Sequence, residues 1–159
     1  MQVYLSLGIS LGLALVNILF SRQERTVKNV IGIILLYLLV INIGLGGIIA
    51  FLGHAFMPDQ IARSIGWAPG SPFQYEVAVA DLAFGVLGVL CLWIRNDFWL
   101  AAGVAQAVFG WGAAVGHIRE AILHGNFAIN NVGPVLFIGD ILLPLTVVVL
   151  LLIHRSLKN

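Results

Sequence analysis

Apolar residues fall into five long runs along this chain, separated by shorter stretches that hold most of the charged residues and prolines. A helix needs about 20 mainly apolar residues to cross a hydrocarbon core that is ~30 Å thick. The pattern therefore predicts an all-α integral membrane protein with five transmembrane helices, at approximately residues 3–20, 30–52, 73–94, 98–118 and 134–153. We expect these helices to form one domain over residues 1–159, because no internal repeat divides the chain.

The longest interval between runs, residues 53–75, predicts a further short helix. The stretch PDQIARSIG (residues 58–66) has proline in its first turn and glycine at its end, as helices commonly do. Its apolar residues recur every four positions, so we expect an interfacial helix on the outer membrane surface, with Trp67 at the headgroup level. Ser71 and Gln74 have the spacing of a capping box at the start of the third span.

Lysine and arginine are distributed unequally between the two ends of the predicted helices. One end has six of these residues, namely Arg22, Arg25, Lys28, Arg95, Arg155 and Lys158. The other end has Arg63 and Arg119. Because positively charged loops are retained in the cytoplasm, we predict that the N-terminus lies outside and the C-terminus in the cytoplasm.

The composition agrees with a chain that is embedded in lipid. Hydrophobic residues make up 60% of the chain and charged residues 9%, and the mean hydropathy is +1.04. A soluble domain needs about 25% charged residues, so the lipid bilayer is the expected partner. The net charge of +1 and the lack of a basic run argue against nucleic acid. Cys91 is the only cysteine, and we interpret it as an inert, packed thiol.

The few ionisable residues inside the predicted spans fall at two depths. Counted at ~1.5 Å per residue from the predicted cytoplasmic helix ends, Asp81 and Asp140 both lie about 21–22 Å up. Glu76 and His117 lie at about 29–30 Å, near the outer boundary. His54 ends the second span on that same side. The sequence therefore predicts a polar layer in the outer leaflet with an acidic pair below it.

Small and polar residues also recur at steps of three and four, which places them on one face of each helix. In the fourth span this stripe consists of Gly103, Gln106, Gly110, Ala113, His117, Glu120 and His124. Similar stripes are Gln74, Ala78, Asp81, Gly85 and Gly88 in the third span and Gly47, Ala50 and His54 in the second. A lipid-facing stripe would be made of large apolar residues, so we expect these stripes to face other helices.

Histidine and carboxylate side chains are the donors that Zn, Mn and non-haem Fe accept, and helix bundles build such sites from inward residues. We therefore predict a divalent metal site that opens outward and supports a membrane-embedded hydrolytic or redox reaction. Its candidate ligands are His54, Asp81, His117, Glu120 and Asp140, with Glu76, Gln106 and His124 as further residues that would support them. No HExxH or repeated ExxH motif is present, so the pattern does not establish an enzyme.

Two other functions fit the same residues. Asp81 and Asp140 at equal depth could share a proton, as in a proton- or ion-coupled small transporter. A chain of this length would then act as a homo-oligomer. Alternatively, the chain is a non-catalytic accessory subunit that binds lipid or quinone. The plain structural interpretation is that polar residues near helix ends reach water and that Asn17 and Asn42 form hydrogen bonds between helices.

Two segments carry a resemblance to a known family, namely FLGHAFMPDQIARSIGWAPGSPFQYEVAVADLAFG and FGWGAAVGHIREAILHGNFAINNVGP. They resemble a family of small bacterial inner-membrane proteins that is described as a domain of unknown function, and the likeness covers about residues 50–145. The resemblance implies a multi-pass protein of the bacterial inner membrane. It implies no activity.

Overall fold

The computed structural model describes residues 2–157, in which helices are joined by loops and no β-strand occurs. Lys158, one of the six basic residues counted above, lies outside the described residues. Five of the described helical segments are long and apolar enough to cross a membrane. The predicted all-α bundle with five spans is therefore confirmed.

The second and fifth spans each contain a π-helix, a wider form of helical turn, and Gly133 separates the short helix α7 (Ile129–Val132) from the rest of the fifth span. In chain order the elements are α1 (Gln2–Phe20), α2 (Val27–Tyr37), π-helix η1 (Leu38–Leu45), α3 (Gly46–Phe56), α4 (Pro58–Ile65), α5 (Phe73–Leu90), α6 (Asp97–His124), α7 (Ile129–Val132), π-helix η2 (Val135–Leu142) and α8 (Leu143–Ser156). The second and fourth spans continue past their predicted outer ends, to Phe56 and His124. Hydropathy misses these turns because polar residues at a membrane interface still fit a helix.

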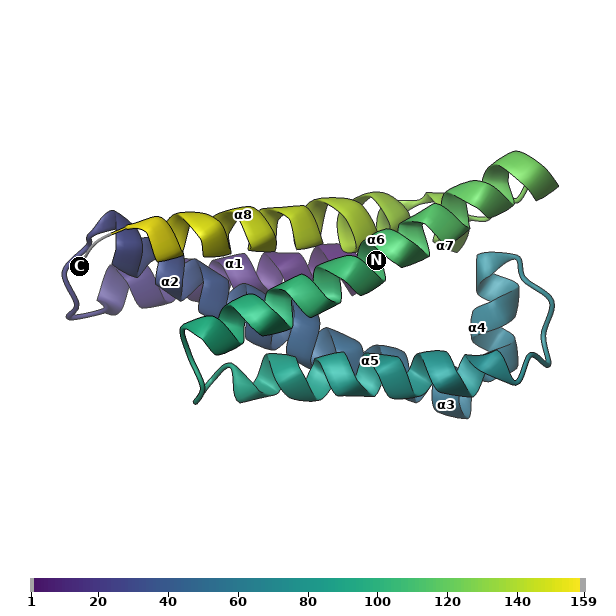
Figure 1. The fold of residues 1–159 in the computed structure, drawn as a ribbon, viewed down its shortest axis with the longest axis horizontal. Coiled ribbons are helices and arrows are strands. Elements are labelled where there is room, and N and C mark those ends of the chain that lie inside the picture. Colours follow the sequence, from purple (N-terminus) through teal and green to yellow (C-terminus); the bar gives the residue numbers. More distant parts are fainter. Residues whose placement is uncertain (1, 158–159) are drawn as a thin grey trace.

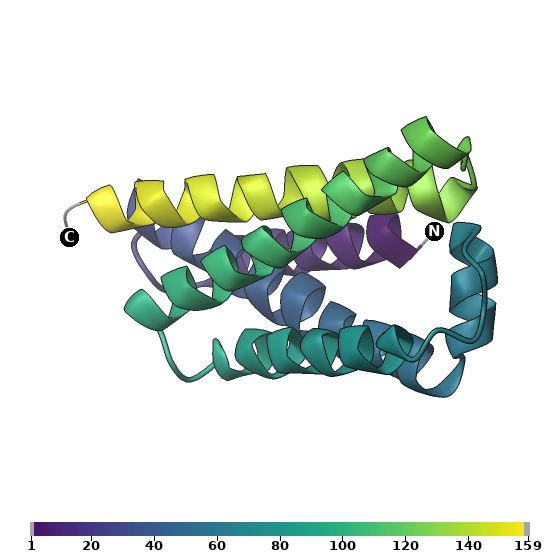
Figure 2. The same ribbon diagram turned by 45° about the vertical axis from the view of Figure 1, so that its right-hand side comes forward.

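The helices are arranged in two groups that the second span connects, because η1 packs on both α1 and α5. α3 packs along α5, while α6 packs along η2 and α8, and α1 packs on α2 and η1. The second span crosses the bundle, since α2 lies on the side of α1 and α8 and α3 lies beside α5 (Figure 1). α1 begins at the end of the bundle where α4 lies, and α8 ends at the opposite end (Figure 2). We call the first of these ends the α4 end.

Glycines allow the helices to approach closely beside the two aspartates. A Cβ atom added to Gly47 of α3 would lie 2.7 Å from the carbonyl oxygen of Asp81 and 2.8 Å from the backbone nitrogen of Gly85. A Cβ atom on Gly110 of α6 would lie 3.2 Å from the carbonyl oxygen of Asp140. At these glycines the small-residue stripes face other helices, as predicted from their spacing, whereas the α6 stripe ends at His124, whose side chain is 63% exposed.

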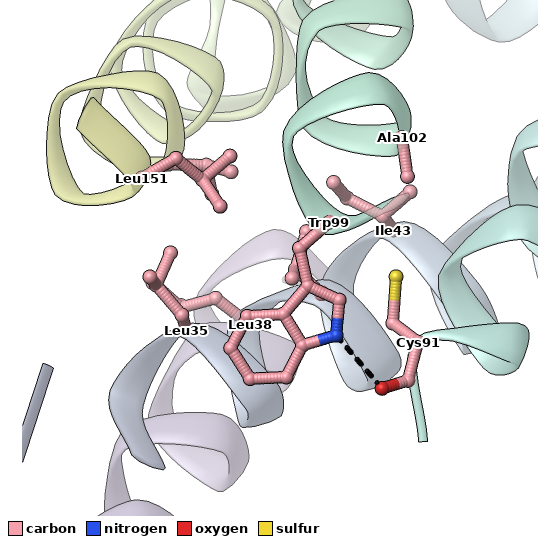
Figure 3. Close-up of a cluster of buried hydrophobic side chains, with 9 residues drawn as sticks. Leu35, Leu38, Ile43, Cys91, Trp99, Ala102 and Leu151 are labelled. Carbon is pink, nitrogen blue, oxygen red and sulfur yellow. Dashed lines mark hydrogen bonds between the residues drawn. The ribbon is translucent and has the colours of Figure 1, made fainter. Parts of the chain in front are cut away.

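A hydrophobic cluster fills the bundle away from the α4 end. Its buried members are Leu35, Leu38, Leu39, Ile43, Cys91, Trp99, Ala102, Val147 and Leu151. Within it the indole Nε1 of Trp99 donates a hydrogen bond of 2.9 Å to the carbonyl oxygen of Cys91 (Figure 3). The Cys91 residue is 0% exposed, which agrees with a packed thiol. Burial of this apolar surface holds the two groups of helices together.

Polar side chains add hydrogen bonds between the helices. Asn42 Nδ2 donates to Ser10 Oγ over 2.8 Å, and Asn17 Nδ2 donates to the Tyr37 hydroxyl over 3.1 Å. Both bonds connect α1 to the second span, so the expected role of Asn17 and Asn42 is confirmed. Within lipid such bonds matter because water cannot replace the missing partner.

The short helix α4 lies across one end of the bundle, at a steep angle to the spans (Figures 1 and 2). As predicted, Pro58 occupies its first turn and Gly66 ends it, with a left-handed backbone at φ 82°. The predicted capping box of α5 is wrong, because Pro72 precedes this helix and no side chain caps it. Gln74 bonds to His54 and to the carbonyl oxygen of Pro58 instead.

Candidate functional site

A cavity of about 250 Å³ lies among α1, the second span, α5, α6 and the fifth span. Its polar lining includes Asp81, Asp140, Asn42 and Gln106, and the rest of the wall is mainly apolar. Asn42 and Asp140 belong to the two π-helices, η1 and η2. The equal depth predicted for Asp81 and Asp140 thus corresponds to one shared cavity in the fold.

The two carboxylates differ in their surroundings from ordinary surface acids. Asp140 Oδ2 is buried and has no hydrogen-bond partner among residues 2–157. The side chains of Asp81 and Asp140 line the same cavity from α5 and η2. A carboxylate oxygen without a donor is costly at membrane depth, and a proton, a cation or a water molecule would satisfy it.

His117 is the basic group nearest to Asp140. The imidazole Nε2 of this α6 residue lies 3.8 Å from Asp140 Oδ2, a distance that is too long for a direct hydrogen bond. The residue is 8% exposed, so the protein and not solvent sets its surroundings. The stripe that begins at Gly103 therefore directs His117 toward the fifth span.

Asn131, at the start of the fifth span, fixes the orientation of the His117 ring. Its amide Nδ2 donates to the carbonyl oxygen of His117 over 3.1 Å and to that of Asn126 over 2.8 Å. Its Oδ1 must therefore be the acceptor for His117 Nδ1, at 2.8 Å. With the hydrogen on Nδ1, the neutral ring presents the lone pair of Nε2 to Asp140.

His54 forms a second polar group nearer the end of α3. Its Nδ1 donates to Gln74 Oε1 over 2.5 Å. Gln74 Nε2 in turn donates to the carbonyl oxygen of Pro58 over 3.3 Å. Gln74 thus connects α3, α4 and α5 and holds the His54 ring by its Nδ1.

The remaining candidate residues lie outside the cavity or at its wall. Glu120 accepts from His124 Nδ1 at 3.1 Å, and the His124 side chain is 63% exposed. Glu76 is exposed on α5. Gln106 lines the cavity as a neutral side chain. These placements separate Glu76, Glu120 and His124 from the pair of His117 and Asp140.

The predicted metal ligands are therefore distributed over three places, namely the cavity, the His54–Gln74 group and the exposed end of α6. Within residues 2–157, no group of three or more His, Cys, Asp or Glu side chains is arranged to hold one metal ion. His117 and Asp140 together could offer one nitrogen and one oxygen donor. Divalent metal binding stays a prediction, with these two residues as its core.

Sequence reasoning missed two residues that surround His117. Asn131 is 0% exposed, although it belongs to a pair of adjacent asparagines in a segment that reads as the polar end of a helix. Trp67 was assigned to the headgroup level, but its indole also stacks on the His117 ring, with ring centroids 5.5 Å apart. The pair of asparagines beside an apolar span is the sequence pattern that could have indicated the contact of Asn131 with His117.

Comparison with known proteins identifies the family to which this chain belongs. A family model described as a family of unknown function (DUF6790) matches residues 2–159, and the chain belongs to this family. No curated protein matches the chain. No solved structure matches it either.

Proposed function

We propose that this member of a family of unknown function is a small proton-coupled membrane transporter, in which His117, Asp140 and Asp81 bind and release the coupling proton. One observation carries the proposal. A buried carboxylate oxygen of Asp140 has no hydrogen-bond donor among the described residues 2–157, and it faces a ring nitrogen of His117 at 3.8 Å. Ionisable groups at this depth commonly mark proton or ion pathways in membrane proteins.

The orientation of His117 supports transfer of a proton between the two side chains. Because Asn131 accepts from Nδ1, a proton that arrives at Nε2 converts the ring to imidazolium beside Asp140. Transfer to Asp140 Oδ2 then restores the neutral ring and leaves a neutral carboxyl group. A closer approach or one bridging water would complete the path, since 3.8 Å exceeds direct hydrogen-bond range.

The carboxylate of Asp81 provides a second position for the proton. It lines the same cavity as Asp140, from α5. Two neighbouring carboxylates disfavour the state in which both are charged, so one proton shared by the pair is the preferred occupancy. The amides of Asn42 and Gln106, which also line the cavity, would orient water between the two acids.

The proposal includes the cellular setting and the assembly. We place the protein in a bacterial inner membrane, as the resemblance described above implies. The distribution of basic residues then places the N-terminus outside and the C-terminus in the cytoplasm. The α4 end then faces outward. A chain of 159 residues is short for alternating access, so we expect a homo-oligomer. A reporter fused after Asn159 should be active in the cytoplasm, and activity outside would reverse the orientation.

Metal binding and the accessory role are kept as alternatives. An apolar groove of about 500 Å³ between α1 and the second span offers a place for a lipid or quinone chain. Elemental analysis and lipid extraction of the purified protein separate these cases from the transporter. If the wild-type protein contains stoichiometric metal and the His117→Ala variant does not, the ion that the cavity binds is a divalent metal and not a proton.

Infrared difference spectroscopy tests proton binding directly. Between alkaline and acidic pH, the wild-type protein should gain the C=O band of a buried protonated carboxyl group. Asp140→Asn should lose or shift this band, because it removes the carboxyl that faces His117. Glu76→Gln, which changes an exposed acid on α5, is the matched control and should keep the band. A wild-type spectrum without a buried carboxyl band would contradict the proposal.

A further inference from the structure

α4 and the loop after it cover His117 on the outer side of the bundle. We call residues 57–70 the lid segment. α4 presents Ala62, which is 1% exposed, to the bundle, and Ile61 contacts Gly53 of α3. The opposite face of α4 is polar and exposed. This segment is not one of the five spans, so its displacement would leave the transmembrane helices intact.

The lid segment touches His117 through Trp67. The indole and imidazole rings are stacked, with centroids 5.5 Å apart and an interplanar angle of 27°. Trp67 is itself 40% exposed, so it separates the His117 ring from the outside. A ring that is 8% exposed beneath a half-exposed tryptophan becomes accessible when that tryptophan moves.

Asn126 fastens the lid segment to the rest of the molecule. Its Nδ2 donates to the carbonyl oxygens of Ile65 and Gly66, over 2.9 and 3.4 Å. Its own carbonyl oxygen accepts from Asn131 Nδ2 over 2.8 Å, and Asn131 holds His117. Two asparagines therefore form one connected path from the lid segment to the ring that faces Asp140.

The lid segment is also attached through the buried Ala62, through the bond from Met57 N to the carbonyl oxygen of Gly53 and through Gln74. Gln74 Nε2 reaches the carbonyl oxygen of Pro58 at 3.3 Å, near the limit of a hydrogen bond. Gly70 ends the segment at φ +84°, with no atom within 4 Å of an added Cβ. This glycine is tied to the lid segment by its N–H, which donates to Asp59 Oδ1 over 3.1 Å, and without a Cβ it adopts backbone angles that strain other residues. It places a hinge where the lid segment joins α5.

We propose that the lid segment is a gate, which opens when Asn126 releases Ile65 and Gly66 and the Trp67 ring leaves His117. The inference rests on the proposed function for its purpose, since opening would give outside water access to the proton-transfer group. Its geometry is independent of that function. In the closed state the same asparagine path holds His117 toward Asp140, so closure and orientation of the ring occur together.

Diethylpyrocarbonate, which modifies accessible neutral imidazole, tests the gate when the modified sites are identified by peptide mass spectrometry. Asn126→Ala should raise the modification rate of His117 about tenfold, the factor that loss of the latch bonds would produce. Trp67→Ala should raise it as well, because it removes the covering ring. Asn130→Ala is the matched control, since the described residues give the Asn130 side chain no hydrogen bond. It should leave the rate unchanged.

Two internal residues make the result decisive. His124, whose side chain is 63% exposed, should react equally in every variant. Cys91, which is 0% exposed, should stay unreactive toward maleimide in every folded variant. If folded Asn126→Ala and Trp67→Ala both leave His117 as protected as in the wild type, there is no gate. If His117 is exposed by both but no proton is bound, the gate stands and the transporter proposal fails.

Discussion

Asn131 is the residue on which the geometry of the site depends most. It makes three hydrogen bonds with its side chain, to His117 Nδ1, to the carbonyl oxygen of His117 and to that of Asn126. Asn131 itself is 0% exposed. Few other side chains could satisfy a ring nitrogen and two carbonyl oxygens at once.

We predict that Asn131→Ala lowers the free energy of unfolding by about 1–3 kcal/mol, the cost of buried polar groups left without partners. Asn130→Ala, at the neighbouring position, should cost less than about 0.5 kcal/mol. Denaturant titration of the protein in mild detergent measures both. Equal stabilities for the two variants would show that the Asn131 bonds do not hold this end of the bundle.

At the residue scale, the sequence identified the acids but not their neighbours. Asp81, Asp140 and His117 could be selected because ionisable residues in apolar spans are rare and their depth follows from helix rise. The contacts of Asn131 and Trp67 could not be derived, since both depend on how loops fold back over the ends of the helices. Glu120 and His124 continue the helical stripe by spacing, but α6 extends past its neighbours there and exposes His124.

At the scale of elements, glycine contacts determine how closely α3 and α5 pack beside the cavity. We predict that Gly47→Ala destabilises the protein by about 1–3 kcal/mol, the typical cost of overpacking. Its added Cβ would lie 2.7 Å from the carbonyl oxygen of Asp81, and backbone atoms cannot turn aside. Thermal unfolding followed by circular dichroism measures the loss.

Gly112→Ala is the matched control on α6, because a Cβ atom there meets nothing within 4 Å. Its stability should equal that of the wild type or rise slightly, since alanine favours helix over glycine. Equal losses in Gly47→Ala and Gly112→Ala would mean that the close packing of α3 on α5 contributes little.

The two π-helices are the elements that sequence reasoning could not predict. Pro144, which lacks the N–H that would bond to the carbonyl oxygen of Asp140 four residues earlier, lies in the first turn of α8, and η2 ends at Leu142. No proline or other sequence pattern indicated η1. Such wide turns are frequent at functional sites, and here each contributes a polar side chain, Asn42 or Asp140, to the cavity.

At the scale of the whole molecule, the fold was accessible from the sequence because lipid imposes a strong constraint. Backbone groups in hydrocarbon must be satisfied within a helix, so apolar runs of sufficient length indicate the spans. The arrangement of the spans was not accessible, because five helices can pack in many orders with the same stripes facing inward. The crossing of the second span, which brings η1 and α3 to the cavity together, is a property of the assembled bundle (Figure 1).

If the cavity carries protons across the membrane, proton flux into proteoliposomes should depend on its two aspartates. With a pH-sensitive dye inside and a pH gradient across the bilayer, the wild-type protein should acidify the interior above the rate of empty vesicles. Asp140→Asn and Asp81→Asn should reduce this flux to the background, while Glu76→Gln should keep the wild-type rate. Wild-type flux that is undiminished in Asp140→Asn, or no flux from the folded wild-type protein, would contradict the account.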